Sequence, residues 1–181
     1  ILIVDGASED AGERAVLERF VETLRARDPD VIEGHNIFKF DLPYLETRAR
    51  KLGVDFALGR DGSAPRSRPS RLQIAERAFQ YRRFAIAGRH VVDTLFLVQF
   101  HDVSAREMES FGLKAAARHF GVAEAGRVEL GAREITLAHR EDREKFRAYA
   151  LQDVRETRAL SAALSPAWFA QASIFPYNYQ D

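Results

Sequence analysis

The chain has 181 residues, enough for one domain with a hydrophobic core, and 46% hydrophobic with 30% charged residues is ordinary for a globular protein. It holds no cysteine, which excludes disulfides and cysteine-based metal sites, and no run of 18 apolar residues, so no membrane span is predicted. The formal net charge of zero neither favours nor excludes nucleic acid as a partner. Because the sequence starts without methionine, we expect it to be a piece of a longer chain.

Apolar spacing and turn residues predict alternating strands and helices. Residues with helical periodicity end at turn or stop residues, such as the Asp28-Pro29-Asp30 sequence and Gly53. The expected order is a strand at 1–4, a helix over 10–27, a strand from 31 to about 34–36, a helix over 41–52, a strand over 90–96, and helices over 110–120 and 141–164. This order predicts an α/β layer architecture.

Positive charge is concentrated in one part of the chain. Residues 60–89 hold eight arginines but only two acids, whereas residues 5–22 have an acidic excess. Residues 59–71 are rich in Gly, Pro, Ser and Arg and predict a flexible basic loop. The basic excess either contacts phosphates or is an ordinary solvated loop.

The stretch GHNIFKFDLPYL, residues 34–45, places Asp41 where a buried strand gives way to a helix. A carboxylate there can cap the helix and interact favourably with its dipole. It can equally bind a metal ion, since α/β sheets usually place ligands at the carboxyl ends of strands. Asn36, close by, supports the second interpretation, because an amide can contact phosphate or hydroxyl groups.

Tyr149 and Asp153, in YALQD, lie four residues apart and therefore on one face of a helix. An aspartate on an inward face needs a partner, and either a divalent cation or an arginine would serve. Asp93 is a third acid, set in the apolar strand HVVDTLF. We expect it to hydrogen-bond a nearby turn or Arg89, with metal ligation as the alternative.

Four segments together resemble the exonuclease domain of family B DNA polymerases. DPDVIEGHNIFKFDLPYLETRA resembles the second exonuclease motif, with Asn36, Phe40 and Asp41 at the positions of Asn-x-x-x-Phe-Asp. YALQDV resembles the third motif, Tyr-x-x-x-Asp, at Tyr149 and Asp153. GRHVVDTLFLV and ESFGLKAAARHFGV resemble the strand and helix between these motifs, so the resemblance covers residues 8–165.

The resemblance implies a ribonuclease-H-like α/β fold, with a mixed sheet flanked by helices, and 3′→5′ proofreading hydrolysis of DNA with two divalent metal ions, Mg²⁺ or Mn²⁺. Asp41 and Asp153 would be metal ligands, and Tyr149 would orient the attacking water. Asn36 and Phe40 would lie beside the terminal nucleotide. The implied partners are a single-stranded DNA 3′ end and a polymerase domain in the same or another chain.

The first motif of that family, an Asp-x-Glu on the opening strand, is not found in this sequence. We therefore expect the sequence to begin after that motif, so that the sheet lacks its first strands and the 181 residues alone are weakly active or inactive. A catalytically inactive module that binds DNA or a polymerase partner is the alternative. A purely structural domain, whose acids are caps and core pairs, is a third possibility.

Overall fold

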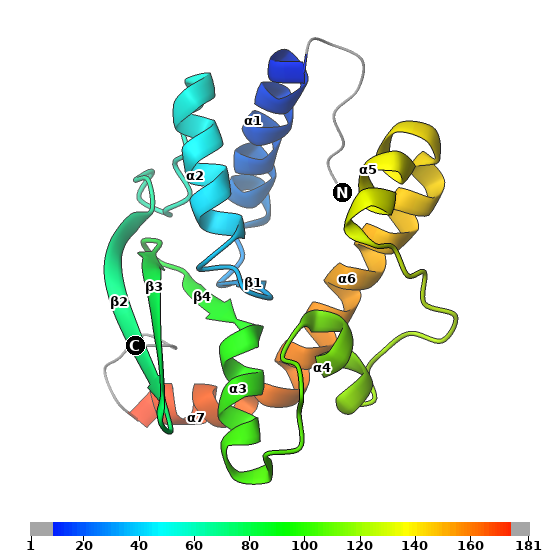
Figure 1. Ribbon diagram of the computed structural model, residues 1–181. Helices are drawn as coiled ribbons and strands as arrows, with labels where there is room; N and C mark the ends of the chain where they lie inside the picture. The colour runs from blue at the N-terminus through cyan, green and yellow to red at the C-terminus, as the bar shows by residue number, and fades with distance from the viewer. Residues whose placement is uncertain (1–8, 175–181) are drawn as a thin grey trace.

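The computed structural model describes residues 9–174, and the strand expected at 1–4 lies outside this range. The elements are α1 (Glu9–Arg27), β1 (Val31–Gly34), α2 (Asp41–Leu52), β2 (Arg66–Ile74), β3 (Arg77–Ala85), β4 (His90–Asp93), α3 (Thr94–Ala105), α4 (Leu113–His119), α5 (Ala132–Glu141), α6 (Arg143–Leu164) and α7 (Pro166–Ile174) (Figure 1). This mixture of helices and small sheets confirms the α/β class.

A short parallel pair of strands lies at the centre of the fold. β1 and β4 pair with Val31 opposite His90 and Gly34 opposite Asp93. Parallel strands need a long crossover, which here consists of α2 and the β2–β3 hairpin. Because both strands end at the same edge, the residues after Gly34 and those after Asp93 meet there.

The β2–β3 hairpin corrects the flexible loop predicted at 59–71. Residues 59–65 lie outside helices and strands, but residues 66–71 belong to β2, which pairs with β3 in antiparallel register from Arg66–Ala85 to Ile74–Arg77. Low-complexity composition concealed this strand, because exposed and half-buried residues make up most of β2 and give no apolar alternation. Figure 1 shows the hairpin extending along one side of the molecule.

α1 and α2 lie side by side and cover the main core (Figure 1). The apolar residues of α1 recur every three or four positions, as the sequence predicts, and Leu17, Val21 and Leu24 are buried. They pack with buried residues from the turn before α2, from α2 and the loop after it, from β3 and the turn after it, from β4 and from α3: Ile37, Phe38, Leu42, Ala49, Phe56, Leu58, Phe84, Ile86, Val91 and Phe96.

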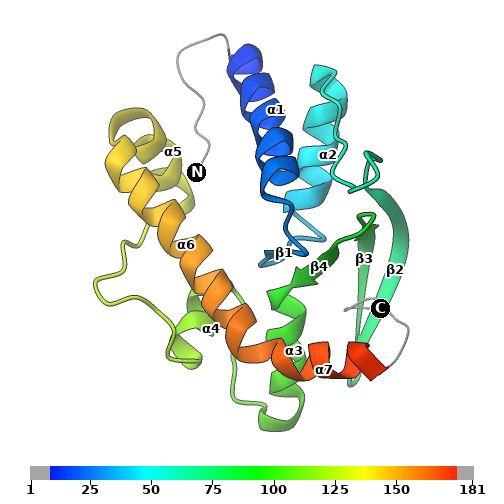
Figure 2. The same cartoon turned by 180° about the vertical axis from the view of Figure 1, so that it is seen from behind.

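The long helix α6 lies on the side of the molecule away from α1 and α2, and it packs against α3, α4, α5 and β1. Figure 2 shows its length, from α5 at one end to α7 at the other. Its core contacts centre on Leu160, which packs with Val98 of α3 and Ala116 of α4. None of the helices within residues 9–174 is long and apolar enough to cross a membrane.

The strand expected over 90–96 ends at Asp93, and a helix begins at Thr94. The carboxylate of Asp93 accepts a hydrogen bond from the Leu95 N–H at 3.0 Å and so caps α3. The residues after it, TLFLV, favour a strand by composition, but the cap and burial on several sides override this preference.

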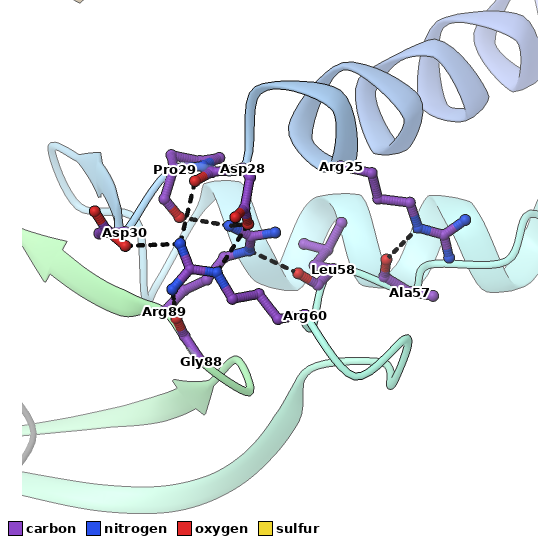
Figure 3. A network of polar contacts seen from close by, with 9 residues as sticks. All are labelled: Arg25, Asp28, Pro29, Asp30, Ala57, Leu58, Arg60, Gly88 and Arg89. Carbon is purple, nitrogen blue, oxygen red and sulfur yellow. Dashed lines mark hydrogen bonds and ion pairs between the residues drawn. The ribbon is translucent and has the colours of Figure 1, made fainter.

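A buried arginine joins the starts of both central strands to the loop after α2. The guanidinium of Arg89 donates to Asp28 Oδ1 at 2.8 Å, to the Leu58 carbonyl at 3.0 Å and to the Pro29 carbonyl (Figure 3). Arg60 donates to Asp28 and Asp30 from the solvent side. Arg89 therefore gives a hydrogen-bond donor to one carbonyl of the turn before β1 and to one of the loop after α2.

Candidate active site

The turn from Gly34 to Asp41 carries the first group of predicted site residues. It is compact: the Phe40 N–H donates to the Asn36 carbonyl at 3.0 Å, and a Cβ at Gly34 would lie 2.9 Å from the Cβ of Ile37. Asn36 has φ +70°, the left-handed region that Asn tolerates better than most residues. The turn therefore requires a residue without a side chain at Gly34 and favours asparagine at position 36.

Asp93 holds the same turn from the end of β4. Its carboxylate accepts from the Asn36 N–H at 2.8 Å and from the Phe38 N–H at 3.3 Å. Burial raises its pKa to about 6, and the charge of Asp41 also contributes to this rise. The predicted role of Asp93, hydrogen bonding to a nearby turn, is confirmed.

Asp41 is the first residue of α2, but it does not cap the helix. The capping position belongs to Phe40, which makes no side-chain cap hydrogen bond. Asp41 instead lies in the first turn, where the helix dipole favours a negative charge. The residue as a whole is exposed, yet its carboxyl group is partly desolvated by the surrounding protein, which raises its pKa.

The aromatic ring of Phe40 is 65% exposed and stacks on Tyr44 of α2, with ring centroids 6.3 Å apart and planes inclined by 9°. Tyr44 is itself 53% exposed, and its hydroxyl donates to Glu13 of α1. An exposed aromatic next to Asp41 is a surface on which a planar group such as a nucleobase can stack.

Tyr149 and Asp153 lie one turn apart on α6, as predicted. Burial, together with the negative charge of Asp153, raises the pKa of the Tyr149 phenol. The ammonium group of Lys114, from α4, lies 5.3 Å from the centre of the Tyr149 ring and donates to the Leu130 carbonyl. At neutral pH the phenol is therefore protonated and acts as a hydrogen-bond group, not as a base.

The partner of Asp153 in this structure is an arginine. Nη2 of Arg127 donates to Asp153 Oδ1 at 2.6 Å, and Nη1 donates to Glu156, which lies three residues further along α6. The sequence left open whether a cation or an arginine would neutralise Asp153, and the structure shows the arginine.

His35 joins the turn after β1 to the start of α3 and to the segment before α4. Its ring nitrogens lie 2.9 Å from the Thr94 hydroxyl and 2.9 Å from the Phe111 carbonyl. The Phe111 carbonyl can only accept, so Nε2 donates to it, while the Thr94 hydroxyl beside Nδ1 donates to the Gly34 carbonyl at 3.2 Å. Burial lowers the pKa of His35, against the opposing charge of Asp153. The turn after β1 and α6 also lie close to each other, because α6 packs against β1.

A divalent cation would need more than these residues provide in this arrangement. Asp41 and Asp153 offer the hard oxygen donors that Mg²⁺ and Mn²⁺ prefer. However, Arg127 holds Asp153, and within residues 9–174 no cluster of three or more histidines or acids is arranged to bind a metal ion. As they stand, these side chains do not fit a metal ion.

Sequence reasoning missed several residues at the site. These are His35, Lys114, Arg127 and Glu156. Glu156 offered a usable signal, because it lies three residues after Asp153 and therefore near the same helical face. Arg127 offered none, since it lies 26 residues from Asp153 in a segment without periodicity.

Comparison with known proteins identifies the family. The model of the DNA polymerase family B exonuclease domain matches residues 8–115. DNA polymerase 2 of Aeropyrum pernix is 35% identical over 177 residues, which cover 94% of this chain and 20% of that protein. The DNA polymerase of Thermococcus litoralis is 34% identical over 160 residues, covering 86% of this chain and 9% of that protein.

A solved structure agrees with these sequence matches. The family B DNA polymerase of Pyrobaculum calidifontis superimposes with a TM-score of 0.67 at 28% identity, covering 88% of this chain and 19% of that one. The chain thus spans about a fifth or less of the length of these relatives. This superposition supports the expected fold, and the chain belongs to the exonuclease domain family of the family B DNA polymerases.

Proposed function

We propose that this domain removes nucleotides from the 3′ end of DNA by phosphodiester hydrolysis, as the proofreading part of a family B DNA polymerase or of a stand-alone relative. One observation supports it above the others. The two motif segments, far apart in sequence, come close together in the fold, because α6, which carries Tyr149 and Asp153, packs against β1, and β1 leads into the turn that carries Asn36, Phe40 and Asp41.

In this proposal the cofactors are two divalent cations, Mg²⁺ or Mn²⁺, and Asp41 and Asp153 would be among their ligands only together with further ligands and once Asp153 is released from Arg127. Tyr149 orients the attacking water, a role that suits a phenol whose raised pKa keeps its proton in place. Asn36 and Phe40 lie beside the terminal nucleotide, and the exposed ring of Phe40 suits a base.

The partners in this proposal are the single-stranded 3′ end of DNA and a polymerase domain, in the same chain or another. The Arg-rich β2–β3 hairpin supplies a positive surface for phosphates on the same molecule. No membrane partner is part of the proposal.

The second candidate is a catalytically inactive module that keeps the fold and binds DNA or a polymerase partner. The pairing of Arg127 with Asp153 favours it, because the arginine already neutralises one of the two acids proposed as metal ligands.

A hydrolysis assay on a 3′-labelled single-stranded oligonucleotide, with Mg²⁺ or Mn²⁺, tests the first candidate in the full-length protein. Asp41→Asn and Tyr149→Phe should abolish or severely reduce cleavage while leaving the folded state intact. Asp55→Asn is the matched control, because Asp55 is an exposed acid paired with Arg25 outside the site. Cleavage that survives Asp41→Asn excludes the proposed mechanism, and absent cleavage with intact DNA binding supports the inactive module.

The 181 residues alone are expected to cleave weakly or not at all. Robust cleavage by these residues alone, lost in Asp41→Ala, would show that they complete the site.

A further inference from the structure

A cavity lies between the distal end of the β2–β3 hairpin and α3, where β2 contacts α3 (Figure 1). Its volume is about 220 Å³. Pockets that bind drug-sized ligands hold roughly 300–1,000 Å³, so this cavity suits a smaller group. Its walls include five apolar side chains and one amide: Ile74, Phe79, Gln99, Val103, Met108 and Phe111.

The amide of Gln99, on α3, is not satisfied by the protein. Its Oε1 is buried and accepts no hydrogen bond from the part of the chain that the structure describes. A buried acceptor without a partner costs free energy, so such an atom in a folded protein calls for an explanation. A ligand in the cavity that donates an N–H group to this amide would supply the missing partner.

The charged residues of the cavity wall are divided between its two sides. Asp102 of α3 is buried, and its carboxylate accepts from the N–H groups of Glu107 and Met108 at 2.8 and 3.1 Å, so its charge is already engaged with the backbone. Arg106, directly after α3, and Glu76, at the hairpin turn, are both exposed. A phosphate is therefore expected on the α3 side of the cavity, at Arg106, and away from Glu76.

Two contacts connect the walls of the cavity to the turn that presents Asp41. The ammonium group of Lys39, in that turn, lies 5.6 Å from the centre of the Phe79 ring. The Phe111 carbonyl accepts from His35, at the start of the same turn, at 2.9 Å. The cavity is therefore a neighbour of the candidate active site, on the side where the hairpin and α3 meet.

We propose that this cavity binds one unpaired base of the DNA strand whose 3′-terminal nucleotide lies at Phe40 and Asp41. The inference rests on the proposed function, which places the end of the strand at that turn. A nucleobase fits the walls, because every base combines a planar ring with an N–H donor that the Gln99 amide can accept. The base belongs to a nucleotide upstream of the terminal one, and Lys39, between the two places, can neutralise an intervening phosphate.

Removal of single bases from the DNA tests this proposal. Short single-stranded oligonucleotides, each lacking one base at a different position counted from the 3′ end, are titrated into the full-length protein without divalent cations, so that the strand is not cleaved. Fluorescence anisotropy measures each affinity. In the wild type, loss of one particular base upstream of the terminal one should weaken binding about tenfold, as expected for a base held among apolar and aromatic side chains.

Val103→Trp fills the cavity from its exposed edge, because Val103 is 39% exposed. This variant should bind the complete oligonucleotide about tenfold more weakly, and removal of that same base should have no further effect. The matched control is Leu137→Trp on α5, which adds the same side chain at a position that is 53% exposed and does not line the cavity. It should leave all affinities unchanged.

Gln99→Leu removes the amide and keeps a side chain of similar size in the wall. The complete oligonucleotide should bind about threefold more weakly, because the base loses one hydrogen bond. The melting temperature, measured by circular dichroism, should not fall, since the lost acceptor has no partner within the described residues. A role of Gln99 confined to the fold predicts the opposite: lower stability and unchanged affinity.

If the effect of each base removal is the same in Val103→Trp as in the wild type, the inference is overturned. If Val103→Trp does not fold, Gln99→Leu decides, and an unchanged affinity for the complete oligonucleotide overturns the inference. Hydrolysis of the complete oligonucleotide with Mg²⁺ separates the two proposals. Absent hydrolysis, with a base effect that Val103→Trp abolishes, removes only the proposed activity; intact hydrolysis, with the same base effects in both proteins, removes only the base site.

Discussion

The carboxylate of Asp93 accepts a hydrogen bond from the backbone N–H of Asn36 at 2.8 Å, so the end of β4 fixes the turn that follows β1. The same carboxylate caps α3 through the Leu95 N–H. One buried acid therefore sets the position of the turn that presents Phe40 and Asp41, and of the helix that begins beside it.

Asp93→Ala should lower the free energy of unfolding by about 2–3 kcal/mol, because it removes a helix cap and leaves two N–H groups of the turn without their acceptor. Urea denaturation measures this loss. Asp142→Ala is the control: Asp142 caps α6 through the Lys145 N–H at an exposed position and should cost only about 1 kcal/mol. Equal losses in the two variants would contradict a special role for Asp93.

His35 should make stability depend on pH. Burial lowers its pKa from the ordinary 6.5, so below that pH the unfolded chain binds more protons than the folded one. The free energy of unfolding should therefore decrease as the pH falls below about 6.5. Above that pH, His35 causes no such loss of stability.

The comparison variant for this dependence is His35→Gln, which keeps polar groups near Thr94 and Phe111 but does not titrate. The difference in stability between the two proteins, measured by denaturation at several pH values, cancels the titration of all other groups. A difference that stays constant between pH 5 and pH 8 would show that the ring is not held neutral in the folded protein.

Phe40→Ala should weaken the binding of a single-stranded oligonucleotide by about 1–3 kcal/mol, the usual worth of one aromatic stacking on a base. Fluorescence anisotropy of a labelled oligonucleotide measures the affinity. Stability should change little, because the ring is 65% exposed. Leu137→Ala on α5, where the side chain is 53% exposed, is the control and should leave the affinity unchanged. Equal affinities in wild type and Phe40→Ala would remove Phe40 from the DNA site.

Arg89→Met should destabilise the fold by about 2–3 kcal/mol, because the Leu58 and Pro29 carbonyls lose a charged donor at a buried position. Thermal or urea denaturation measures the change. Arg60→Met removes a more exposed arginine from the same network and should cost less. The reverse order of the two losses would show that the solvent side of the network carries the stability.

The helices with periodic apolar residues were predictable from sequence, because Leu17, Val21 and Leu24 on α1 mark a buried stripe directly. The β2–β3 hairpin was not, since its arginines and half-buried positions show no alternation of apolar residues. α3 was missed for a different reason: Asp93 reads equally well as a strand residue and as a helix cap until its partner Leu95 is seen.

The candidate site likewise has residues that the sequence predicted and contacts that it did not. The local patterns around Asn36, Phe40 and Asp41, and around Tyr149 and Asp153, were visible because each lies within one element or turn. The contacts of Arg127 and His35 with distant residues were not, because ion pairs and ring hydrogen bonds between separate segments leave no periodic trace.

The hairpin is closed at its base by backbone contacts. The Arg60 N–H donates to the Ala87 carbonyl at 3.0 Å, and its guanidinium donates to the Gly88 carbonyl at 2.8 Å, while Ile86 and Arg89 form a bridge. The segments that enter and leave the hairpin are thus held together by hydrogen bonds at its base. An insertion at the distal turn around Ala75 and Glu76 would leave this base intact but would disturb the contact of the hairpin with α3, because β2 touches α3 and Ile74, next to the turn, is buried.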